Sequence, residues 1–491
     1  MSETFELAVI GAGPAGMEAA IAASEKGVRT VIIDGLPREG GQYYRKPPAA
    51  LALPRTTGVE REGSLLSERL AGTRAVQIFN ALAWGVFKNE EGEGYSVGLY
   101  GSDAPKWVHV RTLVIASGAY DTSVAFPGWT LPGVITSGAA LILAKSQRVA
   151  PGQRALVAGS GPLLLPAAAC LIKAGVELAG VYESTRLFPK GIRYAPILLG
   201  QWQRMREAVQ YLSLLARTRV PYRTGWSILE ARGSEQVEEA LVAKVDPSGV
   251  PLEGSVRTER VDTVVCGFGL TPNTGLARMI GCKMEYQPNK GGWVPLRDPM
   301  LETSQRGVYA AGDGAGIGGA ECARLEGRLA GTAVAVRTGH LGGAEAVRAL
   351  GRITPRLARA RRYGEMFGEL FPPKPGWSSL GRAETLLCRC EDVSLKDIRA
   401  AIADGARTIG EVKMITRVGM GNCQGRMCER PVAGAILQAL GPQGASPDSV
   451  GMYSIRPPLY PLPIGFFAEA GPDEPEPAGG APDGFLSKTD T

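Results

Sequence analysis

The N-terminal stretch from Phe5 to Asp34 constrains the fold of this chain more than any other segment. It consists of an apolar run, a glycine-rich turn, an alanine-rich segment and a second apolar run that ends on Asp34. This order predicts a strand, a tight turn, a helix and a second strand. The residues of the turn are Gly11, Ala12, Gly13, Pro14, Ala15 and Gly16.

Each glycine of this turn has a separate physical task. Gly11 permits the tight turn, Gly13 lets a pyrophosphate approach the backbone, and Gly16 lets the helix pack closely on the sheet. The unpaired N–H groups at the start of the helix then face the phosphates. Asp34 lies 21 residues beyond Gly13, where its carboxylate can accept hydrogen bonds from a ribose. The stretch therefore predicts a dinucleotide-binding unit, with an empty glycine-rich turn as the alternative.

The composition is that of a large protein with several domains. A chain of 491 residues is long enough for about two to four domains, and its 44% of apolar residues can form a large core. The 66 glycines fit many tight turns between strands and helices. The net charge of +6 is spread along the chain, with no basic stripe that carries aromatic residues. We therefore expect no nucleic-acid partner.

The sequence also predicts where the protein is located. It starts with an acidic Met1-Ser2-Glu3, which is unlike a signal peptide. Its longest uncharged stretch, residues 122–144, contains two prolines and three glycines, so no membrane span is expected. Four of its eight cysteines are scattered, which is unlike a secreted disulfide framework. We expect a cytoplasmic protein, with peripheral attachment to the inner membrane as a variant.

Two further segments are expected to contact the same dinucleotide. Gly41 and Gln42 follow Asp34 and would allow close approach to a flat ring, although an ordinary loop is the alternative. A buried strand then ends in a small-residue turn, which in flavoproteins closes over the dinucleotide. That turn consists of Ala116, Ser117 and Gly118.

A third segment, around Gly312 and Asp313, follows another apolar strand and precedes a helix expected from about Ala320. In a flavoprotein this aspartate would hold the ribitol or the pyrophosphate, and the helix would face the isoalloxazine ring. The alternative is a helix start that Asp313 merely caps.

A second unit of the same kind starts near Ala155 and contains Gly159, Gly161 and Glu183. It departs from the first unit at the third glycine position, which holds Leu164. A leucine there should push the helix away from the strand and crowd a pyrophosphate. Glu183 could still hold a ribose hydroxyl. The occupant is left open between NAD(P), another adenine nucleotide such as ATP or ADP, and none.

Four cysteines near the C-terminus form a metal-binding pattern. They are Cys388, Cys390, Cys423 and Cys428, in the order C-x-C, 32 intervening residues, and C-x₄-C. Zinc commonly takes spacers of two to four residues, whereas iron–sulfur clusters are held by four thiolates at varied spacing. Gly421 and Gly425 would leave room for bridging sulfides. A [2Fe–2S] cluster is favoured, and structural zinc or no metal are the alternatives.

These motifs together, above all CRCEDV with GMGNCQGRMC, resemble one group of bacterial flavoproteins. In that group a flavoprotein with two dinucleotide domains is fused to a bacterioferritin-associated-ferredoxin-like (BFD-like) [2Fe–2S] domain. It includes subunits of hydrogen cyanide synthase, opine oxidases, and dye-linked proline and hydroxyproline dehydrogenases. The likeness covers residues 5 to about 468.

The resemblance implies a fold and a set of domains. We expect an α/β protein with two Rossmann-like domains of the glutathione-reductase type and a small helical [2Fe–2S] domain. The expected parts are a discontinuous FAD-binding domain (1–120 and 271–345), a second nucleotide-binding domain (121–270), a connecting arm (346–385), the BFD-like domain (386–445), a C-terminal extension (446–470) and a disordered tail (471–491). Residues 46–66 are expected to form an irregular excursion.

The resemblance also implies partners. In the group, the substrate amine is oxidised at a flavin of a different polypeptide, so we expect a hetero-oligomer with such a partner and, in one variant, a small third subunit. An FMN at a subunit boundary, as in some relatives, is left open. No catalytic base is identified, because the two histidines, His109 and His340, lie outside every motif.

Three functions remain in competition. The first is the FAD and [2Fe–2S] electron-transfer subunit of an amine or amino-acid dehydrogenase or oxidase. The second is a self-sufficient NAD(P)H-dependent reductase, which Leu164 disfavours. The third is a non-enzymatic iron–sulfur docking module.

Overall fold

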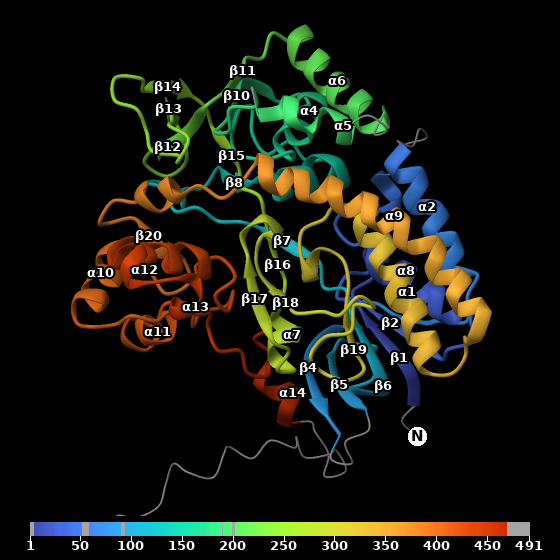
Figure 1. Ribbon diagram of the computed structural model, residues 1–491. Coiled ribbons are helices and arrows are strands. Elements are labelled where there is room, and N and C mark those ends of the chain that lie inside the picture. The colour runs from blue at the N-terminus through green and yellow to red at the C-terminus, as the bar shows by residue number, and fades with distance from the viewer. Residues whose placement is uncertain (1–3, 52–57, 90–93, 189, 199–201, 469–491) are drawn as a thin grey trace, which may run out of the picture.

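The computed structural model describes residues 4–51, 58–89, 94–188, 190–198 and 202–468 (Figure 1). The predicted disordered tail, residues 471–491, lies outside the described residues. Within them, no helix is both long and apolar enough to cross a membrane.

The first module is built on a seven-stranded sheet in the order β3-β2-β1-β6-β5-β4, with β19 also paired to β6. The strands are β1 (Thr4–Ile10), β2 (Thr30–Ile33), β3 (Val76–Ile78), β4 (Leu82–Lys88), β5 (Tyr95–Tyr100), β6 (Trp107–Ile115) and β19 (Val308–Ala310). The start of β6 pairs antiparallel with β5, and its end pairs parallel with β19. Leu7, Val9 and Ile32 are fully buried, as expected for parallel strands covered on both faces.

Two helices of the first module pack unusually closely. They are α1 (Pro14–Ser24) and α8 (Ala320–Arg337). A Cβ atom on Gly327 would lie 2.0 Å from the Ala15 carbonyl oxygen, and one on Gly331 would lie 2.2 Å from the Ala19 carbonyl oxygen. The two glycines therefore bring α8 against the backbone of α1, and so join two segments that lie some three hundred residues apart in sequence.

Two other helices of this module occupy segments in which no helix was predicted. Helix α2 (Gly58–Ala71) takes the end of the expected excursion at 46–66, and α9 (Gly343–Leu370) takes most of the expected connecting arm. Both have an apolar stripe at helical spacing, which in α9 includes the buried Ile353, Leu357 and Ala360. The many Arg, Gly and Pro residues of these segments hide the helical spacing of the apolar residues. The helices are stabilised by packing of the apolar stripe against the rest of the module. In Figure 1, α9 runs alongside α8.

The second module contains a parallel sheet in the order β11-β10-β9-β15-β8 and an antiparallel sheet β12-β13-β14. Its strands are β8 (Val134–Thr136), β9 (Arg154–Gly159), β10 (Glu177–Glu183), β11 (Tyr222–Thr224), β12 (Trp226–Arg232), β13 (Glu239–Lys244), β14 (Arg257–Arg260) and β15 (Thr263–Gly267). Its helices are α3 (Ser137–Leu141), α4 (Leu164–Lys173), α5 (Ala195–Leu198) and α6 (Trp202–Arg217).

The chain crosses between these two modules through a pair of antiparallel strands. These are β7 (Ala119–Asp121) and β16 (Leu270–Pro272). The short helix α7 (Gly275–Met279) and the hairpin β17 (Met284–Gln287) and β18 (Gly292–Pro295) follow on the return. The crossing strands lie at the boundaries predicted after residues 120 and 270, and those boundaries stay predictions.

The cysteine module, residues 386–450, is small and mainly helical. It contains β20 (Leu386–Cys388), β21 (Val393–Ser394), α10 (Leu395–Ala403), α11 (Ile409–Thr416), α12 (Glu429–Gly444) and α13 (Pro447–Val450). Ser394 with Asp397, and Thr408 with Glu411, form capping boxes that start α10 and α11.

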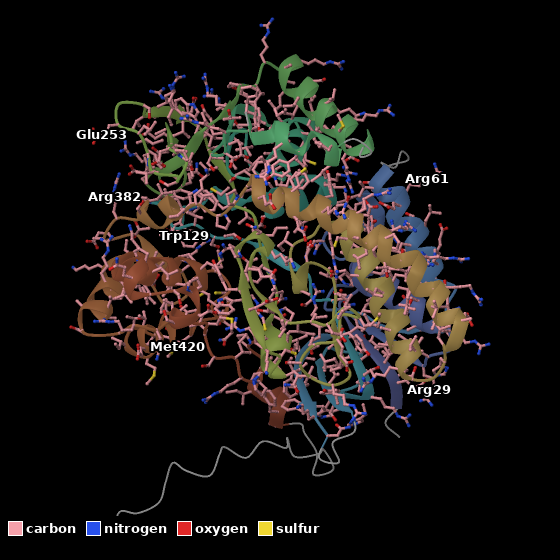
Figure 2. The ribbon with its side chains drawn as sticks, in the orientation of Figure 1. Arg29, Arg61, Trp129, Glu253, Arg382 and Met420 are labelled. Carbon is pink, nitrogen blue, oxygen red and sulfur yellow. The ribbon has the colours of Figure 1, made fainter. Side chains whose placement is uncertain are left out.

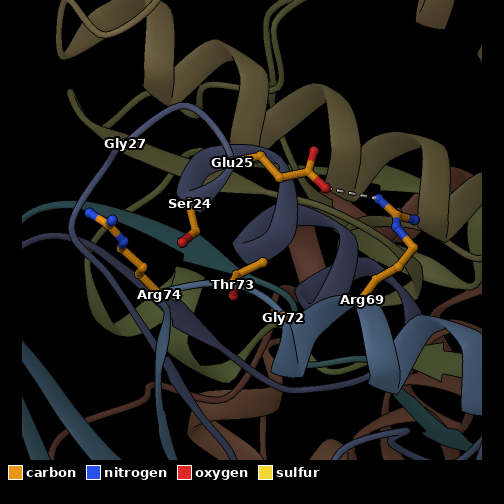
Figure 3. Close-up of a pocket in the computed structure, with 7 residues that line it drawn as sticks. All are labelled: Ser24, Glu25, Gly27, Arg69, Gly72, Thr73 and Arg74. Carbon is orange, nitrogen blue, oxygen red and sulfur yellow. Dashed lines mark ion pairs between the residues drawn. The ribbon is translucent and has the colours of Figure 1, made fainter.

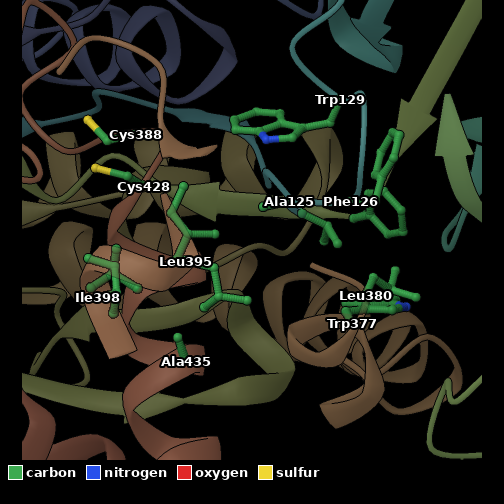
Figure 4. Packing of buried hydrophobic residues seen from close by; sticks show 14 of the residues in the cluster. Ala125, Phe126, Trp129, Trp377, Leu380, Cys388, Leu395, Ile398, Cys428 and Ala435 are labelled. Atoms are coloured by element: carbon green, nitrogen blue, oxygen red, sulfur yellow. The ribbon is translucent and has the colours of Figure 1, made fainter. Parts of the chain in front are cut away.

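The cysteine module shares a core with the second module (Figure 4). Phe126 and Trp129 pack in one buried cluster with Trp377, Leu395 and Ile398. The indole N–H of Trp129, which Figure 2 labels at this junction, donates to the Leu386 carbonyl oxygen over 2.7 Å. The two parts therefore form one continuous apolar interior.

The last helix, α14 (Ile464–Ala468), returns the chain to the first module. Its Phe466 and Phe467 make edge-on contacts with Trp84 of β4 at centroid distances of 6.2 and 5.6 Å. The backbone N–H of Leu459 donates to the Trp84 carbonyl oxygen over 2.7 Å. The C-terminal run is thus fastened to the antiparallel end of the first sheet.

A buried ionic network supports the turn after β19. Glu326 of α8 accepts from the backbone N–H of Gly312 over 3.0 Å, and its carboxylate pairs with Arg297 at 3.0 Å and Arg361 at 2.8 Å. Burial opposes ionisation, but the two guanidinium groups hold the pKa of Glu326 below its ordinary value of 4.5. The contribution of Glu326 to stability is therefore present at neutral pH and is lost as the pH falls below that value.

We predict that Glu326→Ala destabilises the fold by about 3 kcal/mol, because the largely buried Arg297 (12% exposed) would lose its counter-charge and the N–H of Gly312 would lose its acceptor, while the more exposed Arg361 can turn to solvent. The measurement is urea unfolding followed by circular dichroism at pH 7. Glu345→Ala is the matched control, since Glu345 forms an exposed ion pair with Lys26 and its loss should change little. Equal midpoints for the two variants would contradict the role given to Glu326.

Candidate cofactor sites

Of the three glycines in the N-terminal turn, two are packed against the protein's own backbone and one faces open space. A Cβ atom on Gly11 would lie 2.3 Å from the Ala116 carbonyl oxygen, and one on Gly16 would lie 1.7 Å from the Gly11 carbonyl oxygen. Both positions are therefore closed by the protein's own backbone. The nearest atom to a Cβ on Gly13 is the Cα of Gly41, at 3.9 Å. The space above Gly13 is open, which fits a pyrophosphate.

Asp34 is held at this turn by backbone N–H groups. Its two carboxylate oxygens accept from the N–H of Ala12 over 2.6 Å and from the N–H of Leu36 over 2.8 Å. Burial raises the pKa of Asp34, and these hydrogen bonds oppose that rise. A carboxylate has about four acceptor positions, so Asp34 can still accept from ribose hydroxyls.

The loop around Gly41 closes over the same turn. The N–H of Gly40 donates to the Ala12 carbonyl oxygen over 2.8 Å. A Cβ atom on Gly41, whose φ is +57°, would lie 2.8 Å from the Cα of Gly13. Gln42 follows in a turn and is exposed. The structure thus brings Gly41 to the glycine turn, while the predicted ring contact of Gln42 stays a prediction.

The other two predicted segments meet at the ends of β6 and β19. A Cβ atom on Gly314 would lie 2.7 Å from the hydroxyl of Ser117, in the turn from Ala116 to Gly118. A Cβ atom on Gly312 would lie 2.8 Å from the Cβ of Ala15. Asp313 accepts from the N–H groups of Gly318 and Gly319 over 3.0 and 3.1 Å. Burial raises its pKa. These segments therefore surround the turn that α1 starts from.

We predict that Gly13→Val folds but loses FAD, because its side chain enters the pyrophosphate path without meeting protein atoms. The measurement is the flavin absorbance per polypeptide after purification. Gly351→Val is the matched control, since a Cβ at this exposed helical glycine meets nothing within 4 Å. A folded Gly13→Val protein with its full FAD content would refute the assignment.

The second glycine turn resembles the first at its first two glycines but has Leu164 at the position of the third. A Cβ on Gly159 would lie 1.9 Å from the Gly267 carbonyl oxygen, whereas Gly161 has nothing within 4 Å. Helix α4 begins at Leu164, although α1 begins directly after its second glycine. Leu164 is 1% exposed, and its Cδ2 lies 2.6 Å from where a Cβ on Gly267 would stand. The side chain is accommodated by a glycine on β15 and a delayed helix start.

Glu183 repeats the arrangement of Asp34. Its carboxylate accepts from the N–H of Gly161 over 2.9 Å and from the N–H of Thr185 over 2.7 Å. Burial raises the pKa of Glu183 to about 7, against the effect of these hydrogen bonds. The second turn therefore carries a carboxylate in the position that corresponds to Asp34, and this carboxylate is more deeply buried than that of Asp34.

The four cysteines of the C-terminal pattern lie in two pairs. Cys388 ends β20 and hydrogen-bonds with Cys428, which precedes α12, and this bond lowers the pKa of Cys388 to about 5 (Figure 4). Cys390 receives a backbone N–H from Cys423, while burial and the neighbouring Cys423 thiol raise its pKa overall. Hydrogen bonding between Cys388 and Cys428 raises the pKa of Cys428.

This pairing fits a two-iron cluster better than a single ion. Cys388 interacts with Cys428, and Cys390 interacts with Cys423. A [2Fe–2S] cluster takes two thiolates on each iron, and the two pairs match that division. Backbone N–H groups of Gly419, Cys390 and Glu391 point to the Cys388 sulfur, and such donors stabilise a thiolate ligand.

Tyr453 belongs to this site and was missed from the sequence. Its hydroxyl lies 3.7 Å from the Cys428 sulfur, and its side chain is 4% exposed. A Cβ on Gly425 would lie 2.5 Å from the Tyr453 ring, and one on Gly421 would lie 2.2 Å from the Cys390 Cβ. The expectation that both glycines leave room for sulfides is therefore corrected, since both make room for protein side chains. No local pattern marks Tyr453, which is brought in by the chain after α13.

The residues directly after Cys428 tie this site to the first module. Glu429 pairs with Arg278 of α7 at 3.2 Å. Arg430 donates to the hydroxyls of Thr122 and Thr271, each over 3.2 Å, beside the crossing strands. Desolvation lowers the pKa of Arg430. These contacts fasten the cysteine module to α7 and to the crossing strands.

Both histidines are engaged in hydrogen bonds away from the predicted sites. His109 hydrogen-bonds with Ser96 over 2.8 Å, and His340 with Glu6 over 3.0 Å. A cleft of about 380 Å³ lies between the ends of α1 and α2 (Figure 3) and is crossed by an ion pair of Glu25 with Arg69 at 3.6 Å. None of the predicted site residues lines it.

The fold and these sites define a class: an oxidoreductase with two dinucleotide-type domains and a cluster-binding thiolate domain. Residues 5–339 match the family model described as pyridine nucleotide-disulphide oxidoreductase, and residues 386–438 match the BFD-like [2Fe-2S] binding domain. The chain therefore belongs to the pyridine nucleotide-disulphide oxidoreductase family and carries a BFD-like [2Fe–2S] binding domain.

Individual relatives share nearly the whole chain. The HcnB subunit of hydrogen cyanide synthase from Pseudomonas aeruginosa is 33% identical over 470 residues, which cover 94% of this chain and 98% of that protein. An opine oxidase subunit from Agrobacterium tumefaciens is 31% identical over 479 residues, with coverage of 94% and 91%. These matches confirm the predicted family.

A solved structure shares the fold. The L-proline dehydrogenase of P. horikoshii has a TM-score of 0.66 at 21% identity and covers 95% of this chain and 79% of that chain. The predicted fold class, α/β with two Rossmann-like sheets and a C-terminal BFD-like region, is confirmed. The chain is thus a flavoprotein oxidoreductase with a [2Fe–2S]-binding domain.

Proposed function

We propose that this chain is the FAD- and [2Fe–2S]-binding electron-transfer subunit of a heteromeric amine or amino-acid dehydrogenase or oxidase. The observation that carries the proposal is the contact between the cysteine module and the flavin module. Cys428 belongs to the cluster site, and its next two residues, Glu429 and Arg430, bind Arg278 and the crossing strands of the flavin module. The likeness to subunits of hydrogen cyanide synthase and opine oxidase over nearly their whole length supports the same conclusion.

The chain's own residues bind and orient in this function. Gly13, Gly41 and Asp34 would hold the pyrophosphate and ribose of FAD, and Asp313 would hold its ribitol end. The four thiols would hold the cluster, and Tyr453 would donate to the sulfur of Cys428. A bound flavin supplies the ability to take two electrons together and release them singly.

Oxidation of the substrate itself is assigned to a partner subunit. In the described residues both histidines are engaged in hydrogen bonds away from the glycine turns. The substrate class is an amine or amino acid, such as an opine, proline, hydroxyproline or a glycine-like compound. A flavin-containing partner, a small third subunit, an FMN at a subunit boundary and a cytoplasmic location remain predictions.

The second glycine turn is proposed to take an adenine nucleotide such as ADP or ATP. Glu183 has the position from which Asp34 would bind a ribose, and Gly161 leaves open space. Leu164 replaces the third glycine of the dinucleotide pattern, and on this ground of sequence a nicotinamide dinucleotide, and with it the self-sufficient NAD(P)H-dependent reductase, is the less favoured occupant. The iron–sulfur docking module without enzymatic function is disfavoured because the cluster site is fastened to the flavin module.

We predict that calorimetry at pH 8, where Glu183 is mostly ionised, detects binding of ADP and only weak binding of NADH. Glu183→Gln should weaken ADP binding about tenfold or more, because it removes a charge-assisted acceptor. Glu177→Gln, at the exposed start of the same strand, is the control. A low-micromolar affinity for NADH, or bleaching of the flavin by NADH, would overturn this assignment.

We predict that Cys423→Ser removes the reduced-state EPR signal of the cluster and leaves FAD bound, because the flavin motifs lie in other segments. In the assembled complex, electron delivery from substrate to a dye acceptor should slow. Cys282→Ser, at a buried cysteine remote from the cluster motif, is the control. Full turnover without the cluster would make the centre structural and would remove the mechanism proposed here. Zinc without iron or sulfide in the anaerobic protein would have the same effect.

A further inference from the structure

The hydroxyl of Tyr453 is placed directly against a sulfur atom of the cysteine site. Its oxygen lies 3.7 Å from the Sγ of Cys428, which is within hydrogen-bonding distance for sulfur. Tyr453 is 4% exposed, and Cys428 and Cys388 are each 1% exposed, so the contact is shielded from solvent. A buried phenol needs a hydrogen-bond partner, and Cys428 supplies it.

Two glycines make room for the ring of Tyr453. A Cβ atom on Gly425 would lie 2.5 Å from the Cδ2 of the ring, and one on Gly419 would lie 2.9 Å from its Cε2. Both glycines have a φ of +82°, a left-handed conformation that glycine adopts readily. The loop that ends at Cys428 is therefore shaped around this ring, and the packed ring fixes the direction in which its hydroxyl points.

The backbone of Tyr453 is tied to the flavin module. Its N–H donates to the carboxylate of Glu429 over 3.2 Å, and its carbonyl oxygen accepts from the guanidinium of Arg278. Glu429 and Arg278 also form an ion pair at 3.2 Å. Because Arg278 belongs to α7, the position of Tyr453 depends on the contact between the cysteine module and the flavin module.

The chemistry of a thiolate ligand decides the direction of the hydrogen bond. A cysteine that binds iron has lost its proton, whereas a phenol, with an ordinary pKa of about 10, keeps its proton at neutral pH. The hydroxyl of Tyr453 is therefore the donor, and the sulfur of Cys428 is the acceptor. Reduction adds one negative charge to a cluster, so a donor to a ligand sulfur stabilises the reduced form more than the oxidised form. Hydrogen bonds to the sulfurs are among the factors that set cluster potentials.

Tyr453 differs from the other donors at this site. Backbone N–H groups of Gly419, Cys390 and Glu391 donate to the sulfur of Cys388, and these groups belong to the cysteine module itself. They are in place whenever that module is folded. Tyr453 is a side chain from the segment after α13, so its donation depends on where that segment is held.

We propose that Tyr453 sets the reduction potential of the cluster through its hydrogen bond to Cys428. The pair of Arg278 and Glu429 couples this potential to the seating of the cysteine module on the flavin module. One electron enters the cluster from the flavin, and the proton stays on the phenol oxygen. When the two modules separate, the donor leaves the sulfur and the reduced cluster loses stabilisation. This inference rests on the proposed function, since it requires the cluster.

The experiment is an anaerobic redox titration of the holoprotein, followed by the EPR signal of the reduced cluster. Tyr453→Phe keeps the packed ring and removes only the oxygen. At a fixed potential its ratio of reduced to oxidised cluster should fall about tenfold, which is a shift of about 59 mV to lower potential for a one-electron centre. Tyr460→Phe is the matched control and should leave the potential unchanged, because Tyr460 follows in the same segment and its ring packs on Arg426.

Arg278→Gln tests the coupling to the flavin module. It removes the guanidinium from the carbonyl of Tyr453 and should lower the potential by less than Tyr453→Phe does. The double variant should have the potential of Tyr453→Phe alone, because both changes act through one hydrogen bond. All variants should keep their FAD content and the full intensity of the EPR signal, which separates a changed potential from a damaged site.

An unchanged potential in Tyr453→Phe would overturn the proposal, and so would loss of its EPR signal, which would make the tyrosine structural. Additive shifts in the double variant would overturn the coupling, because Arg278 would then act on the cluster by its own charge. A wild-type protein without iron and sulfide would instead overturn the proposed function itself.

Discussion

The close approach of backbone to backbone at the N-terminal glycine turn is the constraint on which this structure depends. Gly16 lies against the Gly11 carbonyl group, Gly11 lies against Ala116, and Gly312 lies against Ala15. At each contact a single methyl group would collide with a neighbouring atom. The ends of β1, β6 and β19 can meet only because these side chains are missing, and a pyrophosphate can reach Gly13 only because they meet. The fit of α8 to α1 through Gly327 and Gly331 extends the same constraint along both helices.

The second glycine turn shows how one plan tolerates a different packing. Both turns use a carboxylate at the end of the second strand to accept a turn N–H, Asp34 in one and Glu183 in the other. The first turn excludes a side chain at Gly16, whereas the second admits Leu164 because β15 has Gly267 beneath it. Helix α4 accordingly starts at Leu164, later than α1 starts after its own second glycine. The same backbone plan can thus serve a tightly bound dinucleotide in one place and a different occupant in the other.

The two sides of the cysteine module differ: one is attached to the flavin module and the other is open to solvent. Its inner side is fastened to the flavin module by two consecutive residues after Cys428, through an ion pair and hydrogen bonds to threonine hydroxyls. On its other side Cys390 is exposed, whereas Cys388 and Cys428 are buried. A rigid attachment on one side and an open edge on the other is what a relay needs, because electron transfer depends steeply on distance on both sides of the centre.

The sequence by itself determined the glycine turns, their carboxylates and the four cysteines. Each depends on local rules: a missing Cβ, a fixed spacing, or the preference of iron–sulfur clusters for thiolates. The resemblance that these motifs carry to a group of flavoproteins also predicted the family and the fold class. The prediction from the sequence was wrong for the end of the segment at 46–66, which forms α2, and it did not show that the arm after residue 345 is helical, because the stripe of Ile353, Leu357 and Ala360 is recognised only when α8 lies beneath it.

Tertiary structure alone decided the groups that come from distant segments. Tyr453 reaches Cys428, Arg430 reaches the crossing strands, and Gly267 makes room for Leu164, none of which has a signature in its own neighbourhood. Tertiary structure also decides that Cys388 and Cys428 are buried while Cys390 is exposed. Which thiol is buried is set by the shared core around Trp129 and Ile398, since burial is a property of the packed chain and not of any residue within it.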